Sequence, residues 1–387
     1  MLIISKIHSR LSAPLLSAVL FFLYMPYLAG MIGPERYSEF SFMLQGLLFY
    51  SSLFILKTDF NILYRARKDG SAGYDLPVFL LLLSIPLCIL VYMYNKDVIF
   101  LLVPLSAAYL ILYSSAVVAG DMLSIGKSEF CYKISLILLT FLFVLWGIDI
   151  VFAVIGSMLF RLFFLSSNIS IFFMGKRIFN LAKIIEDIVL IKWWVASQCL
   201  MLVGGFLPML SIGSLFSAKL FGFYLLSITV ITGASSLVGK ALADVFFEYT
   251  VDVIKLKDIM IKTYKYSFVM FLFGFTMYTY MEGLVLYFMG EDWQGFHRVS
   301  LYILVLAYGS FLSNCFDKLP QYFRHERYTL FFNLLRLIIN GSVLALSLIF
   351  NFDFYSYLLF FTVSNTLMYL FDVLFVFRVV RKNVLSL

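Results

Sequence analysis

Long apolar segments recur along the whole chain, and they constrain its fold more than any other feature. Each is about 20 residues long, the length that an α-helix needs to cross a bilayer core about 30 Å thick. Of the 387 residues 63% are hydrophobic and only 13% are charged, which is far from the balance of a water-soluble globule. We therefore expect an all-α polytopic membrane protein.

The apolar segments predict about twelve transmembrane helices joined by short connections, arranged as two six-helix bundles. Little of the chain is left for a soluble domain. The predicted spans are 11–33, 38–56, 75–95, 98–120, 131–148, 150–174, 193–214, 217–240, 266–290, 298–318, 328–350 and 354–378.

Lysine and arginine alternate between the two sides of these spans. With the N-terminus placed inside, 23 of the 29 basic residues fall in cytoplasmic segments or at the adjoining ends of spans, and only four fall in the outward connections or at the span ends beside them. Basic residues near the ends of spans are held on the cytoplasmic side, so this asymmetry predicts that both termini face the cytoplasm. The remaining two basic residues lie deeper inside predicted spans.

A connector near the middle of the chain separates the first six spans from the last six. Its apolar residues recur at helical spacing with basic residues at its margins, which indicates a helix lying in the membrane interface. We predict an N-terminal six-helix bundle over 1–175, the connector over 176–192 and a C-terminal six-helix bundle over 193–387. A paired arrangement of this kind is typical of secondary transporters, whose substrate path lies between the two bundles.

Signatures of catalysis, metal binding and nucleotide binding are missing from the sequence. The three histidines are far apart, the four cysteines form no CxxC pair, and no GxxxxGK[ST] segment is present. The basic residues are spread over seven cytoplasmic segments, which favours contact with membrane lipids over a nucleic-acid patch. We expect no catalytic residue, no metal, no cofactor and no nucleic-acid partner.

Two arginines at membrane depth are candidate substrate-binding residues. Arg161 lies in the sixth predicted span, and Arg336 lies in the eleventh with Asn333 and Asn340 on its helical face. A guanidinium matches the oxygens of a phosphate group with paired donors, so either arginine can bind an anionic group such as a pyrophosphate. The alternative is that each pairs with a buried carboxylate or extends to the cytoplasmic interface.

Three more charged residues are candidates near the ends of spans. Lys57 closes the second span and Lys240 the eighth, and both are positioned to flank a vestibule that faces the cytoplasm. Lys240 is equally compatible with a solvated helix end that pairs with Asp244 and Glu248. Glu282 lies in the ninth span, where a carboxylate facing a cavity can carry a coupling proton; the alternative places it near the outer interface.

Several blocks of sequence resemble a known transporter family. They are IGPERYSEFSFMLQGLLFYSSLFILKTDFNIL from Ile32 to Leu63, LFGFYLLSITVITGASSLVGKALADVFFEY from Leu220 to Tyr249, and GEDWQGFHRVSLYIL from Gly290 to Leu304. Their order and spacing resemble the polysaccharide-transport branch of the multidrug/oligosaccharidyl-lipid/polysaccharide exporter superfamily, the O-antigen and related repeat-unit flippases.

This resemblance implies a flippase that moves a polyprenyl-diphosphate-linked glycan across a bacterial cytoplasmic membrane, with the polymerase and glycosyltransferases of the same pathway as partners. Arg161, Arg336 and Lys57 are our candidates for contact with the head group, while the polyprenyl tail stays in lipid. A drug exporter of the same superfamily is the first alternative, but it favours acidic residues deep in the first bundle, where the predicted spans show none. A repeat-unit polymerase is disfavoured because the outward connections are short.

Overall fold

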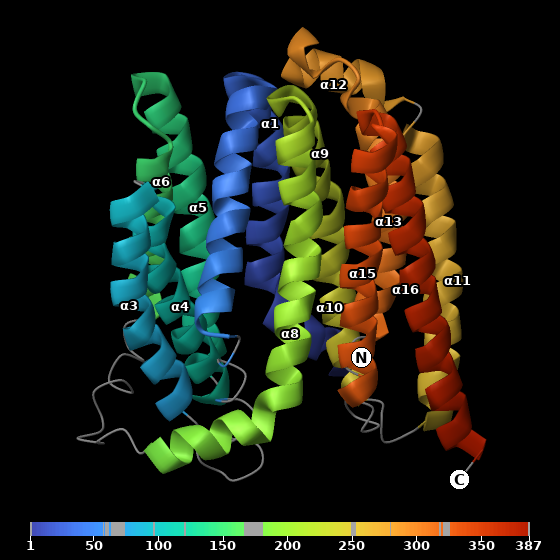
Figure 1. Cartoon of the computed structure of the whole chain (residues 1–387). Helices are drawn as coiled ribbons and strands as arrows, with labels where there is room; N and C mark the ends of the chain where they lie inside the picture. Colours follow the sequence, from blue (N-terminus) through green and yellow to red (C-terminus); the bar gives the residue numbers. More distant parts are fainter. Residues whose placement is uncertain are drawn as a thin grey trace. The chain divides into compact units, whose positions relative to one another are not determined.

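The computed structural model of the chain is built from helices wherever residues are described (Figure 1). Eight of these helices are long and apolar enough to cross a membrane, so the protein is a multi-pass α-helical membrane protein. These eight candidate spans are Asp75–Asn95, Ile99–Ala119, Ser124–Trp146, Val195–Leu215, Ala218–Ser236, Phe296–Phe316, Arg327–Phe350 and Phe354–Arg381. The structure describes residues 2–56, 58, 62, 74–95, 97–119, 121–165, 181–248, 253–278, 280–316, 319 and 326–385.

The chain groups into two compact units, which we describe separately. Unit 1 consists of 1–21 and 40–202, and unit 2 consists of 22–39 and 203–387. Two long helices, α1 (Leu2–Phe54) and α8 (Leu181–Leu215), therefore contribute residues to both units. The predicted division into two six-helix bundles stays a prediction.

Unit 1 contains two pairs of neighbouring helices. α3 packs on α4 and α5 packs on α6, while α4 also contacts α5 and α6 (Figure 1). Local sequence sets the ends of α5, because Asp121 accepts a hydrogen bond from the Ser124 amide at 3.1 Å and Gly147 ends the helix in the left-handed conformation. The bounds are Asp75–Asn95 for α3, Ile99–Ala119 for α4, Met122–Trp146 for α5 and Val151–Leu165 for α6.

α8 is a bent helix whose first part runs at a large angle to the part that follows (Figure 1). Ile184, in the first part, is buried against Leu76 of α3, whereas Ile185, Ile188 and Val189 are exposed. This part of α8 covers most of the predicted connector, and its first residues, 176–180, lie outside the described residues. Its predicted place in the membrane interface stays a prediction.

Unit 2 is organised around α13, which contacts α9, η2, α10, α11, α12 and α16. α15 packs on α16. The bounds are Ala218–Ser227 for α9, Ile228–Thr232 for the π-helical turn η2, Gly233–Glu248 for α10, Val253–Tyr278 for α11, Met281–Met289 for α12, Glu291–Trp293 for the 3₁₀ turn η4, Phe296–Phe316 for α13, Glu326–Phe350 for α15 and Phe354–Leu385 for α16.

The ninth predicted span, 266–290, differs from the structure. α11 begins at Val253 and ends at Tyr278, and the apolar residues that follow form a separate short helix, α12, which lies across the end of the bundle (Figure 1). Hydropathy merged the two helices because both are rich in large apolar residues, including those that α12 exposes. The predicted start came too late because lysines in the first turns of α11 interrupt its apolar pattern.

α1 consists of two helices that meet at Gly33 and correspond to the first two predicted spans. Gly33 has φ 78° and ψ 164°, a conformation that strongly favours glycine. The next residue, Pro34, suits the first position of a helix because its missing N–H has no helical partner there. The Gly-Pro step therefore ends one helix and starts the next.

The Gly-Pro turn of α1 packs on the start of α9 within unit 2. A Cβ atom on Gly222 would lie 2.1 Å from the carbonyl oxygen of Pro34, so only glycine permits this approach. Trp293 is 1% exposed, and its Nε1 donates a hydrogen bond to the carbonyl oxygen of Ala29 at 3.2 Å. Its ring centroid lies 6.0 Å from that of Tyr37 and 5.3 Å from that of Phe223. Three sequence blocks far apart in the chain thus meet around one tryptophan.

Candidate functional site

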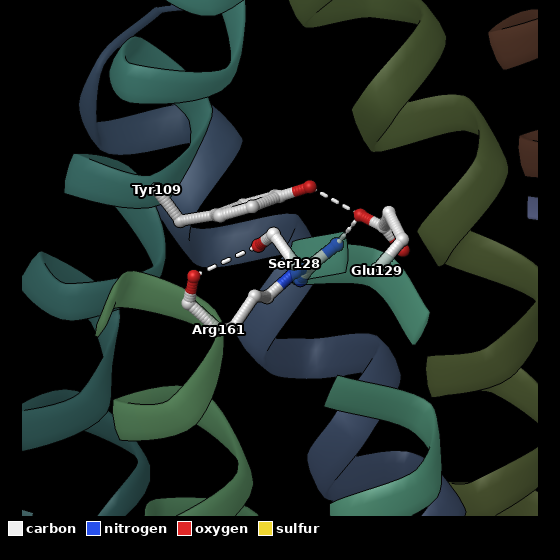
Figure 2. Close-up of polar contacts among 4 residues, drawn as sticks. All are labelled: Tyr109, Ser128, Glu129 and Arg161. Carbon is white, nitrogen blue, oxygen red and sulfur yellow. Dashed lines mark hydrogen bonds and ion pairs between the residues drawn. The ribbon is translucent and has the colours of Figure 1, made fainter. Parts of the chain in front are cut away.

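Arg161 of α6 is paired with a carboxylate in unit 1. Its Nη2 forms an ion pair with Oε1 of Glu129 on α5. The hydroxyl of Tyr109 on α4 donates a hydrogen bond to the same oxygen (Figure 2). The side chains of Arg161 and Glu129 are 11% and 19% exposed, respectively. Of the two open interpretations of Arg161, the structure supports the pairing with a buried carboxylate.

Aromatic rings enclose the Arg161 guanidinium. Its Cζ lies 3.4 Å from the ring centroid of Tyr109, which lies over it in Figure 2. The ring centroid of Tyr132 lies 4.4 Å from the same atom, so both rings contribute cation–π attraction. Ser128 donates a hydrogen bond to the backbone carbonyl of Arg161 at 2.8 Å, which joins α5 to α6 beside the ion pair. The cluster is held by three helices, as expected for a charge that must be satisfied away from water.

Glu129 was missed as a site residue because it precedes 131, where the fifth span was predicted to begin. In the structure α5 begins nine residues earlier, and Glu129 lies inside a candidate span. A carboxylate is therefore buried in the first half of the chain, contrary to our expectation from the predicted spans. Lys133, one helical turn after Glu129 and partly buried, makes the cluster of Arg161, Glu129 and Lys133 net positive.

Arg336 of α15 has different surroundings in unit 2. Its Cζ lies 5.6 Å from the ring centroid of Tyr369, and its Nη2 lies 3.7 Å from the position that a Cβ on Gly205 would occupy. Its Nε is buried without a hydrogen-bond partner. Within the described part of the chain Arg336 forms no ion pair, so its charge is balanced by no carboxylate there.

Amides lie one turn further along the same helix. Asn340 donates to the carbonyl oxygen of Gly204 at 2.7 Å, and Asn365 of α16 donates to the side-chain oxygen of Asn340 at 2.8 Å. The amide of Asn340 is therefore committed to α8 and α16, and a shared site with Arg336 stays a prediction.

The other predicted site residues are placed less fully. Lys57 lies outside the described residues, and Lys240 lies in α10 with a side chain that is not described. Glu282 lies in the first turn of α12, half exposed, with Oε1 3.3 Å from Nδ1 of His297. Among the described residues no group of three or more His, Cys, Asp or Glu side chains is placed to hold a metal ion.

Asp372 of α16 is a second carboxylate that the sequence reasoning missed. It is 7% exposed and lies within a candidate span. Ser313 of α13 donates to its Oδ2 at 2.6 Å, and Tyr328 of α15 donates to its Oδ1 at 3.1 Å. An acidic residue inside a predicted span was the signal that could have found it.

Neither a model of a known protein family nor a curated protein sequence matches the chain. Solved structures do match. An inward-facing structure of a multidrug resistance MATE family transporter of the MOP superfamily superposes with a TM-score of 0.59 at 16% sequence identity, over 96% of this chain and 98% of the other. The chain has the fold of the MOP superfamily transporters.

Two further solved structures match the chain with similar TM-scores. Lipid II flippase MurJ, in an inward closed conformation, superposes with a TM-score of 0.59 at 14% identity over 95% of this chain and 86% of the other. A MOP superfamily transporter from Pyrococcus furiosus Vc1, in which a reversed polarity of the binding pocket suggests a different function, gives 0.57 at 14% identity over 97% and 96%. At these identities the likeness establishes the MOP fold, and the substrate must be argued from the residues of this chain.

Proposed function

We propose that this chain is a flippase that moves polyprenyl-diphosphate-linked oligosaccharide repeat units, of O-antigen or another surface polysaccharide, across the bacterial inner membrane. The MOP fold supports transport, and a lipid-linked flippase is among the structures that share it. In this proposal both termini face the cytoplasm, and the pathway's polymerase and glycosyltransferases are the partners.

The observation that carries the proposal is the unbalanced guanidinium of Arg336. Placing a cation at membrane depth is unfavourable by about 3 kcal/mol or more, so a cation there normally has a partner. Arg336 forms no ion pair among the described residues, and tyrosine and glycine lie next to it. A diphosphate supplies the charge and the paired acceptor oxygens that a guanidinium matches.

The unit 1 cluster also favours an anionic substrate over a cationic drug. Glu129 is a buried carboxylate of the kind expected in a drug exporter, but Arg161 neutralises it and Lys133 lies one turn away. A cationic drug would have to displace Arg161 to reach this carboxylate. The drug exporter therefore remains the alternative, and the charge balance of the described residues supports the flippase.

The test deletes the gene in its native host and asks on which membrane face the lipid-linked repeat unit accumulates. A membrane-impermeant reagent that oxidises sugars distinguishes the two faces in spheroplasts. We expect repeat units to stay protected in the deletion strain and to become accessible when the wild-type gene is restored. Single repeats that reach the outer face without being polymerised would identify a polymerase instead.

The variant Arg336→Gln tests the proposed head-group contact in the same strain. We expect surface polysaccharide to fall about tenfold or more, since a hydrogen-bonded charge contributes roughly 1.5–3 kcal/mol. Arg327→Gln is the matched control, because Arg327 is an exposed arginine on the same helix. Equal output from the two variants would remove Arg336 from the substrate path.

A further inference from the structure

A proline inside α8 deprives one backbone carbonyl of unit 2 of its helical hydrogen bond. Pro208 is buried and lies within the candidate span Val195–Leu215. In a regular helix the N–H of residue 208 would donate to the carbonyl oxygen of Gly204, four residues earlier, but proline has no N–H. An unpaired carbonyl inside a membrane is unfavourable, so this oxygen requires a donor from elsewhere.

Asn340 of α15 supplies the required donor. Its Nδ2 lies 2.7 Å from the carbonyl oxygen of Gly204, and the residue is 2% exposed. The two helices lie close together at this point, because a Cβ on Gly204 would lie 3.5 Å from the backbone N and Cα of Leu337. A side-chain amide of α15 therefore takes the place of the backbone N–H that α8 lacks.

Asn365 of α16 fixes the orientation of the Asn340 amide. Its Nδ2 donates to Oδ1 of Asn340 at 2.8 Å and to the carbonyl oxygen of Phe361 at 2.9 Å, which uses both of its N–H groups. Because the side-chain oxygen of Asn340 accepts from Asn365, the NH₂ group of Asn340 is the part that faces Gly204. One series of buried hydrogen bonds thus joins α8, α15 and α16.

Arg336 lies one helical turn before Asn340, on the same face of α15. Its Nη2 lies 3.7 Å from the position that a Cβ on Gly205 would occupy, and Gly205 follows Gly204 in α8. The stretch of α8 that Asn340 binds therefore lies beside the guanidinium. The hydrogen bond of Asn340 sets the register of α15 against α8, and this register sets the place of the guanidinium.

We propose that Asn340 is a positioning residue for Arg336, because its amide replaces the N–H that Pro208 lacks and so fixes α15 on α8. Without this amide the Gly204 carbonyl is unpaired, and the two helices must shift to satisfy it. Such a shift moves the paired donors of Arg336 away from the oxygens of a diphosphate. The anchor between Asn340 and Gly204 stands on its own geometry, whereas its effect on an anion rests on the proposed function.

The first test is a double-mutant cycle on the thermal stability of the purified full-length protein in detergent. Asn340→Ala should lower the melting temperature by a few degrees, because the Gly204 carbonyl loses its donor. Pro208→Ala restores a backbone N–H at this point, so Asn340→Ala should lower the melting temperature clearly less in that background. An equal loss in both backgrounds would overturn the anchor.

Pro104→Ala is the matched control, because Pro104 also lies inside a span, that of α4 in unit 1. Asn340→Ala should lower the melting temperature as much in the Pro104→Ala background as in the wild type. An effect that shrinks equally with either proline variant contradicts the anchor. If Asn340→Ala alone does not fold, folded protein from Pro208→Ala/Asn340→Ala supports the anchor, and misfolding of both variants refutes it.

The second test measures binding of inorganic pyrophosphate to the full-length protein in lipid nanodiscs. Asn340→Ala should weaken binding about fivefold in the wild type, and by no more than about twofold in Arg336→Lys, which has already lost the paired donors. A loss of stability alone does not produce this difference between backgrounds. Equal losses in the two backgrounds would show that Asn340 does not act through Arg336.

Ser300→Ala is the control for binding, because it removes the 2.9 Å hydrogen bond between Ser227 of α9 and Ser300 of α13 and leaves α15 unchanged. It should leave pyrophosphate binding at the wild-type level, and a loss as large as that of Asn340→Ala contradicts the positioning role. Wild-type affinity in Asn340→Ala refutes that role as well. A wild type that binds no pyrophosphate contradicts the proposed function instead, and the melting temperatures still decide the anchor.

Discussion

The guanidinium of Arg161 is neutralised by the carboxylate of Glu129, whereas that of Arg336 has no such partner among the described residues. Both arginines lie in apolar helices, and both looked alike as candidates in the sequence. We infer that the first charge stabilises the fold, and we propose that the second binds a ligand. The difference leads to opposite predictions for the two residues.

Replacing Arg161 should destabilise the protein. Arg161→Met leaves the Glu129 carboxylate buried without its cation, which is destabilising by about 3–5 kcal/mol. We expect a clearly lower melting temperature for the purified protein in detergent. The double variant Arg161→Met/Glu129→Met should recover most of the loss because neither charge remains; a double variant as unstable as the single one would contradict the pairing.

Replacing Arg336 should leave the melting temperature unchanged or raise it. Arg336→Gln removes a partly buried charge without leaving a described carboxylate unpaired. Arg336→Lys keeps the charge but loses the paired donors, so surface polysaccharide should fall less than with glutamine. A melting temperature that drops as far as in Arg161→Met would show that Arg336 has a structural partner.

Gly222→Ala should disrupt the contact between α9 and the Gly-Pro turn of α1. The new Cβ would lie 2.1 Å from the Pro34 oxygen and 2.8 Å from its carbon, both of which are backbone atoms. Overpacking of this kind destabilises by roughly 1–3 kcal/mol or more. Gly341→Ala is the control, since nothing lies within 4 Å of its Cβ position, and it should match or exceed wild-type thermal stability.

Trp293 should contribute more through packing than through its hydrogen bond. Trp293→Ala removes a fully buried ring and should lower stability by roughly 3–5 kcal/mol. Trp293→Phe keeps most of the packing and loses the bond to Ala29, so a loss of about 1 kcal/mol is expected. Thermal melts of the two variants test whether Trp293→Ala loses more stability than Trp293→Phe. Equal losses would show that Trp293 stabilises the protein mainly through its N–H group.

Asp353 should make the stability of the protein depend on pH in the acidic range. This exposed carboxylate precedes α16 and accepts hydrogen bonds from Ser356, which hold its pKa below the ordinary value of 3.8. Its contribution is therefore present above pH 3.8 and is lost as the pH falls through the lowered pKa. The difference in melting temperature between wild type and Asp353→Ala should shrink as the pH drops below 3.8; a constant difference would contradict the capping role.

Hydropathy identified most of the helices but placed some boundaries wrongly. The predicted spans 75–95 and 98–120 agree closely with α3 and α4, because both helices are apolar from end to end. The fifth span was placed too late, since polar residues interrupt the apolar pattern around Glu129 even though this residue is buried. Because hydropathy records only local apolar character, it also assigned α12 to the end of the ninth span. Glu282 therefore lies in α12 and not in the long helix in which we expected it.

The amino-acid sequence by itself determined that the chain is helical and crosses the membrane many times. Lipid offers no hydrogen bonds to backbone N–H and C=O groups, so apolar segments of about 20 residues must form these bonds within a helix. The sequence also identified Arg161 and Arg336 as charges at membrane depth. Only the tertiary structure decided that Glu129 neutralises one of them and that Ser313, Tyr328 and Asp372 meet. Such contacts depend on how helices distant in sequence pack, which local hydropathy does not record.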